Sequence, residues 1–292
     1  MGQDADHLVL SDRYWSQAAL GTAPIQTRRP LYNILPLVTE VVVTNPVLKQ
    51  NYQGFQLSVR KRLASGLEFT SSYTWSHAMS DNAGFYGPSV GNVPNQMQDY
   101  HNRRAEWGPA SMDIRHNWVT SYNYGLPFGR GRKFLGGASR LTDLILGGWN
   151  SSGVLTFRTG LPVTVGESPD TSNSGSLAPR PDAIKNGILP AGQRGPDGWF
   201  DTTAFVRQAP NTFGNAGNGT LRDPGISDVD FALQKRFTVR EGKWFEFRAE
   251  AFNILNHPVF TNVGHTLGNA NFGKATAAEA EREMQLGLKF YF

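Results

Sequence analysis

The feature that most constrains the fold of this chain is an alternation of apolar and polar residues with a period of two. In the segment 67–76, the odd-numbered residues include Leu67, Phe69 and Trp75, whereas every even-numbered residue is polar. Successive side chains of a β-strand point to opposite faces of the sheet. The pattern therefore predicts strands that have one apolar face and one polar face.

Seven segments carry this alternation and are predicted as antiparallel strands, with a shorter eighth piece at 36–43. The seven are 55–63, 67–76, 114–124, 149–158, 228–237, 244–252 and 284–292. The first two are joined by Ala64-Ser65-Gly66, which predicts a hairpin.

The connections between these segments differ greatly in length. The links at 64–66 and 238–243 are short, and the link at 125–144 is of medium length. The long ones, rich in Gly, Asn, Pro and Asp, are 77–113, 159–225 and 253–283. Short turns at one end and long loops at the other are typical of a bacterial outer-membrane β-barrel.

The two faces of the predicted strands differ in chemistry. Aromatic residues of the apolar face occur near strand ends, where membrane–water interfaces favour them. The candidates for this membrane girdle are Tyr73, Trp75, Trp118, Tyr122, Phe290 and Phe292. The polar face carries charges in mid-strand, which suit a wet lumen. The lumen-facing candidates are Arg60, Glu68, Asp230, Glu246, Arg248 and Glu250.

Lys61 and Lys235 lie on the apolar face just before short turns. We expect their ammonium groups to extend to the periplasmic interface. Periodicity alone also fits a soluble β-sandwich whose outer faces meet water, and this alternative stays open at this point.

Composition argues against several other classes of function. The absence of Cys excludes disulfides and thiol chemistry, and the six His residues show no metal-ligand spacing. Basic residues are scattered, so we expect no nucleic-acid partner. Glu246 and Glu250 flank Arg248 on one face, which indicates a charge-balanced wall rather than an acid–base pair. We therefore expect no enzyme, no cofactor and no metal.

Two further observations bear on the membrane. No stretch approaches the roughly 20 apolar residues of a membrane-spanning helix. The Gly-rich, basic link Pro127–Lys133 has the residue types of a phosphate contact. We interpret it as a periplasmic turn with solvated cations.

Six stretches in collinear order, over roughly residues 50–292, carry a resemblance to a known family. They are Asn51–Val59 with Lys61-Arg62, Ser72–Ser76, Asp113–His116, Gly147–Trp149 with Arg158–Pro162, Arg248–Pro258 and Gln285–Phe292. They resemble the barrel region of TonB-dependent receptors, especially the large Oar-like type.

The resemblance implies an all-β, transmembrane antiparallel β-barrel in the bacterial outer membrane. It implies energy-dependent uptake of a scarce nutrient, with the long loops as the extracellular binding surface. The ligand stays open among a saccharide, a peptide and a metal chelate. The resemblance also implies contact with outer-membrane lipid and assembly by the barrel-assembly machinery, with Phe292 as the assembly signal.

The family's signal peptide, TonB box and plug domain have no counterpart in this sequence, so contact with TonB would require a plug that is absent here. Seven or eight strands are too few for a barrel of this type, and an open sheet would leave unpaired edges in lipid. We therefore expect the C-terminal part of a larger barrel. Residues 1–49 would be an extracellular loop or irregular lead-in, and 50–292 the barrel strands. A non-transporting structural or adhesive barrel and a soluble binding module remain alternatives.

Overall fold

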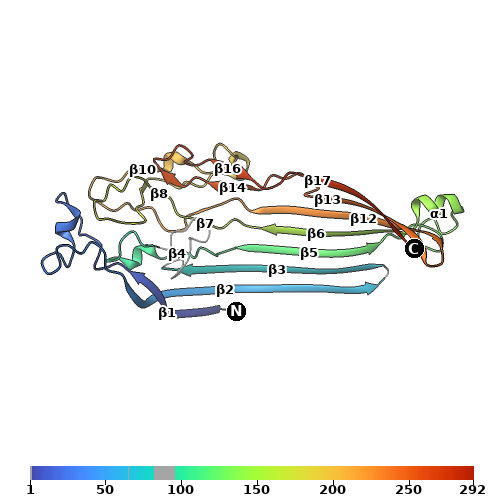
Figure 1. The fold of residues 1–292 in the computed structure, drawn as a ribbon, viewed down its shortest axis with the longest axis horizontal. Helices are drawn as coiled ribbons and strands as arrows, with labels where there is room; N and C mark the ends of the chain where they lie inside the picture. The colour runs from blue at the N-terminus through green and yellow to red at the C-terminus, as the bar shows by residue number, and fades with distance from the viewer. Residues whose placement is uncertain (1, 65, 82–95) are drawn as a thin grey trace.

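The computed structural model describes residues 2–64, 66–81 and 96–292. Eight long strands form one antiparallel sheet, and the molecule is elongated along them (Figure 1). In sheet order these strands are β1 (Gly2–Asp12), β2 (Val43–Ala64), β3 (Leu67–Ser80), β5 (His116–Gly125), β6 (Trp149–Arg158), β12 (Ile226–Arg240), β13 (Lys243–Phe252) and β17 (Glu283–Tyr291). The short strand β4 (Gly108–Pro109) pairs with β3. The sheet is open, with β1 and β17 at its edges.

All seven strands predicted from the alternation are confirmed, and the segment 149–158 coincides with β6. The eighth piece predicted at 36–43 is wrong, because β2 begins only at Val43. The carbonyls of Pro36 and Val38 accept hydrogen bonds from the Gln26 side chain, at 2.8 and 2.9 Å. These carbonyls bond to a neighbouring loop side chain, so the apolar run folds as a turn.

The lead-in expected over residues 1–49 also needs correction. Residues 2–12 form β1, which pairs antiparallel with residues 43–53 of β2. The run Leu8-Val9-Leu10 has no alternation, so the period-two pattern did not reveal this strand. The pairing register shifts twice, on either side of Leu8.

The register aligns the two faces across the whole sheet. Leu57 pairs with Tyr73, Tyr73 with Trp118, and Trp118 with Phe157, so the apolar residues of four strands share one face. The adjacent residues along each strand form the opposite, polar face. Much of the apolar face is exposed among the described residues, and at the β17 edge Leu286 is 76% exposed.

The two ends of the sheet differ, as the connection lengths predicted. One end, here called the turn end, carries the β12–β13 turn, the helix α1 (Arg140–Leu146) and the C-terminus (Figure 1). Gly66 and Gly242, both with φ of 79°, allow the tight turns there. Residue 65 of the predicted hairpin turn and residues 82–95 of the first long loop lie outside the described residues.

A soluble β-sandwich is the wrong architecture for this chain. A sandwich needs two sheets packed face to face, whereas the long strands form one sheet. Among the described residues, no helix is long and apolar enough to cross a membrane.

Candidate functional site

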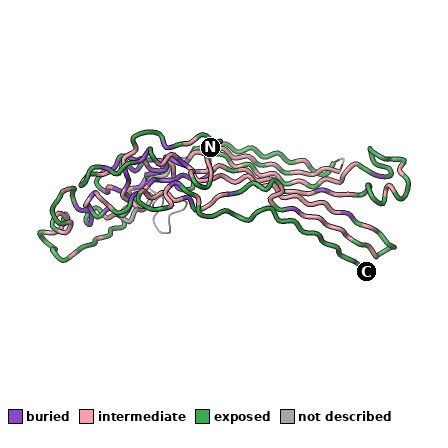
Figure 2. Tube along the Cα trace, turned by 90° about the horizontal axis from the view of Figure 1, so that it is seen from above, coloured by how far each residue is buried: buried purple, intermediate pink, exposed green. Residues whose placement is uncertain are grey.

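The long connections fold together at the end of the sheet opposite the turn end. We call this unit the loop head and define it as residues 13–42, 96–115, 159–225 and 253–282. Its short strands are β7 (Pro162–Val163), β8 (Gly166–Glu167), β9 (Asp182–Ala183), β10 (Phe205–Val206), β11 (Leu221–Arg222), β14 (Phe260–Val263), β15 (Thr266–Leu267) and β16 (Ala275–Ala278). Buried residues gather here rather than along the sheet (Figure 2).

A hydrophobic core stabilises the loop head. Val163, Val165 and Phe200 are buried in one cluster, together with residues such as Phe205 and Val263. These residues come from two loops, and β15 of one pairs in parallel with β8 of the other. Burial of such side chains contributes roughly 1.5–3 kcal/mol each, so the loops form a folded unit.

Gln98 links three of the loops through buried polar contacts. Its side-chain amide donates to the Gly214 carbonyl at 2.9 Å, and its Oε1 accepts from the Arg180 backbone N–H at 2.7 Å. Its backbone carbonyl accepts from the Gln17 amide at 2.6 Å. Buried polar groups need such partners, so each of these loops depends on the others for its hydrogen-bond partners.

Asp113 joins the loop head to the sheet. Its carboxylate accepts from the Ala78 N–H in β3 at 2.7 Å and from Arg115 Nε at 3.2 Å, and it pairs with Arg222. Arg222 also donates to the Gly160 carbonyl at 3.1 Å. Burial raises the pKa of Asp113, but the Ala78 hydrogen bond and the two arginines outweigh it, so the pKa lies below its usual value.

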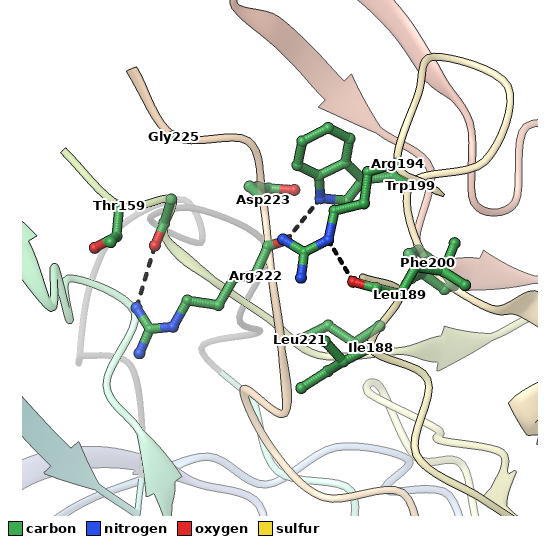
Figure 3. A pocket seen from close by; sticks show the side chains of 11 residues that line it. Thr159, Ile188, Leu189, Arg194, Trp199, Phe200, Leu221, Arg222, Asp223 and Gly225 are labelled. Atoms are coloured by element: carbon green, nitrogen blue, oxygen red, sulfur yellow. Dashed lines mark hydrogen bonds between the residues drawn. The ribbon is translucent and has the colours of Figure 1, made fainter. Parts of the chain in front are cut away.

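A cavity of about 420 Å³ opens in the loop head (Figure 3). Arg222 forms part of its wall, and Ile188, Leu189 and Phe200 supply apolar surface. Its volume falls within the range of about 300–1,000 Å³ that small-molecule sites occupy.

Trp199 and Arg194 give this cavity its chemistry. The Trp199 indole Nε1 donates to the Arg222 carbonyl at 2.8 Å, and Arg194 Nε donates to the Leu189 carbonyl at 2.7 Å. The guanidinium carbon lies 5.9 Å from the Trp199 ring centroid, and in Figure 3 the Arg194 side chain lies between Trp199 and Leu189. An indole ring with a cation over its face suits a ligand that has a flat or apolar part and an anionic or hydroxyl group.

The family model of the outer membrane beta barrel domain matches residues 1–285. The chain belongs to this family. A search of curated proteins found no match.

Among solved structures, the chain matches the outer membrane transporter YddB from Escherichia coli. The TM-score is 0.44 and the sequence identity 8%, and the match covers 100% of this chain. It covers 29% of the transporter, so the chain spans less than a third of that protein's length.

As an outer membrane β-barrel domain, the chain lies in the bacterial outer membrane, and its open sheet is part of a barrel wall. The apolar face of an outer-membrane barrel meets lipid, the polar face lines the lumen, and short turns are periplasmic. On these rules we infer a periplasmic turn end and an extracellular loop head.

The register separates the two predicted residue sets onto opposite faces. The apolar face carries Tyr73, Trp75, Trp118, Tyr122 and Phe290, and the polar face carries Arg60, Glu68, Asp230, Glu246, Arg248 and Glu250. Phe292 lies just beyond the end of β17. The second set does not meet in one site. Arg248 pairs with Glu250 at 3.0 Å, and Glu246 faces Lys289 on β17, as in a charge-balanced wall.

Lys235 departs from the sequence prediction. Its Nζ donates to the Leu144 carbonyl at 2.6 Å and to the Asp143 carbonyl at 3.3 Å, and the residue is buried. The expected extension into the membrane interface is wrong, because the carbonyls of α1 supply a nearer set of acceptors.

Sequence reasoning missed the cavity residues Arg194, Trp199 and Arg222. The aromatic pair Trp199-Phe200, inside a long Gly- and Pro-rich segment, was the available signal. Among the described residues, no group of three or more His, Asp or Glu side chains is placed to hold a metal ion.

Proposed function

We propose that this chain is the C-terminal barrel portion of a TonB-dependent, Oar-like outer-membrane receptor that takes up a scarce nutrient. The observation that carries the proposal is the cavity in the folded loop head, at the end of the sheet that we infer to be extracellular. The six collinear motifs, each on or beside a strand of that wall, support the family type. Contact with TonB would run through a plug domain outside this sequence.

Within this proposal the cavity is the ligand-binding site. Trp199 would contact a ring or apolar face of the ligand, and Arg194 an anionic or hydroxyl group. A saccharide and an acidic peptide fit this chemistry, and a carboxylate-bearing metal chelate fits it as well. The role is uptake rather than catalysis, and neither a cofactor nor a nucleic acid takes part.

Growth on limiting nutrients tests the proposal. Cells that carry the gene are grown on a panel of oligosaccharides, oligopeptides and iron chelates, each as the limiting source. We expect deletion of the gene and deletion of TonB to abolish growth on the same member of the panel. Unchanged growth on every member of the panel after either deletion contradicts uptake. Loss of cell adhesion without a growth defect would indicate the structural or adhesive barrel.

A pair of variants connects the cavity to the uptake. Arg194→Ala removes a cation from the cavity wall and should raise the nutrient concentration needed for growth several-fold. Lys185→Ala removes a cation from the same loop but outside the cavity, where Lys185 pairs with Asp201 at 2.6 Å. It should leave growth unchanged.

A further inference from the structure

The helix α1 is held against the lipid side of the barrel wall. Trp149 and Lys235 are cross-strand partners on the apolar face of β6 and β12. Trp149 Nε1 donates to the Ile145 carbonyl at 2.8 Å, and Lys235 Nζ donates to the Leu144 carbonyl at 2.6 Å. Both bonds end on the C-terminal turn of α1, where carbonyls lack partners within the helix. They fix the helix at the turn end, outside the lumen.

The side chains of α1 form an apolar stripe that no described residue covers. Leu141, Leu144 and Ile145 are 74%, 54% and 66% exposed. Residues spaced by three and four share one side of a helix. Since α1 is docked on the lipid-facing surface of the wall, its stripe continues that surface at the periplasmic boundary.

Four cations lie before or at the start of this helix in the sequence. Arg130, Arg132 and Lys133 precede α1, and Arg140 is its first residue. All four are exposed. The one acid of the segment 126–148 is Asp143. Its carboxylate already accepts a hydrogen bond from the Arg130 backbone N–H at 2.7 Å. The segment therefore presents a net positive charge beside exposed apolar side chains.

We propose that residues 126–148 bind anionic glycerophospholipids of the periplasmic leaflet. An apolar stripe flanked by Lys and Arg is the pattern of helices that lie in a membrane interface and prefer anionic headgroups. The stripe inserts among the acyl chains, and the four cations contact headgroup phosphates. Lipopolysaccharide is also anionic, but it belongs to the leaflet beside the loop head. The inference depends on the barrel orientation and not on the proposed receptor function.

Native mass spectrometry of the full chain tests the proposal. The chain is produced in outer membranes, extracted in mild detergent and mixed with phosphatidylglycerol, phosphatidylcholine or lipopolysaccharide. We expect phosphatidylglycerol to be retained at least tenfold better than phosphatidylcholine. Substitution of Arg130, Arg132, Lys133 and Arg140 by Gln should abolish that preference, and substitution of the three arginines by Lys should keep it.

A matched control removes four exposed cations from the loop head instead, with Arg103, Arg104, Lys185 and Lys274 each replaced by Gln. It should retain the phosphatidylglycerol preference. Heat-modifiable electrophoretic migration of every variant verifies that the barrel is folded. Equal retention of the two phospholipids, or a preference that survives loss of the four turn-end cations, overturns the proposal. A preference for lipopolysaccharide that depends on those cations overturns the assigned leaflet.

Discussion

Arg180 and Glu106 are 74 residues apart in the sequence and form a two-point ion pair inside the loop head, with nitrogen–oxygen distances of 2.7 and 3.0 Å. Both side chains are almost fully buried. The Glu106 carboxylate also accepts from the Gln98 backbone N–H at 3.1 Å. The pair therefore ties the loop after β3 to the loop after β6.

Glu106→Gln should loosen the loop head, because it leaves the Arg180 charge buried without a counterion. Breaking a buried pair in this way costs about 3–5 kcal/mol. Hydrogen exchange of residues 159–225 should become faster by orders of magnitude. The control is Asp201→Asn, which breaks the exposed pair with Lys185 and should leave the exchange of these residues nearly unchanged, because exposed ion pairs contribute little to stability. Equal protection in Glu106→Gln and the unmodified chain would contradict the structural role of the pair.

Acid should open the junction between loop head and sheet. The pKa of Asp113 is lowered in the folded chain, since the Ala78 N–H and the arginines outweigh its burial. As pH falls, the unfolded form takes up the proton first. The stabilisation is therefore complete above the ordinary Asp pKa of about 3.9 and is lost as pH falls through the lower folded value.

Tryptophan fluorescence followed against pH measures this loss. Asp113→Asn should lower stability at neutral pH and remove the step below about pH 4. His265 provides an internal comparison, because burial lowers the pKa of its imidazole. The stability that depends on its neutral form therefore declines from about pH 6.5 downward. That decline should persist in Asp113→Asn. An unchanged step below pH 4 would show that another carboxylate controls the junction.

Lys235→Met should release α1 from the wall. The substitution leaves the Leu144 carbonyl without its ammonium donor, and a lost partner of this kind costs about 1–3 kcal/mol. A spin label at Leu141→Cys should become markedly more mobile. Lys61→Met is the matched control, since Lys61 lies on the same face, opposite Phe69 and near another turn. Equal mobility in Lys235→Met and the parent would refute the anchoring role.

Loss of Phe292 should impair assembly in the outer membrane. In the structure Phe292 is exposed beyond the end of β17, with its ring 5.8 Å from that of Phe290. If the assembly machinery recognises this terminal aromatic residue, its deletion should reduce the heat-modifiable, folded fraction several-fold. Phe292→Tyr keeps the ring and should assemble normally. Normal assembly after the deletion would show that Phe292 is not the assembly signal.

The sequence predicted the sheet well because alternation is a local property. The face of Phe69 or Glu68 follows from its neighbours, and the register merely aligns faces that each strand already had. β1 was missed because Leu8, Val9 and Leu10 follow one another without alternation.

The loop head could not be predicted by the same argument. Gln98 contacts Gly214, and Arg180 contacts Glu106, across separations that no local pattern encodes. The contact of Lys235 with α1 could not be predicted either, since α1 begins 95 residues earlier in the chain, at Arg140. The cavity is formed by residues that are distant in the sequence, so it could not be predicted from any one segment.

The central claim, that one face of the sheet meets lipid and the other water, is tested most directly by spin labels along β6. The chain contains no Cys, so single-cysteine variants from Asn150 to Arg158 carry one label each. The account predicts that labels at odd positions such as Leu155 are accessible to oxygen dissolved in lipid. Labels at even positions such as Thr156 should instead be accessible to a water-soluble nickel complex. Alternation with a period of two would support a barrel wall, whereas access of the nickel complex to both faces would contradict it.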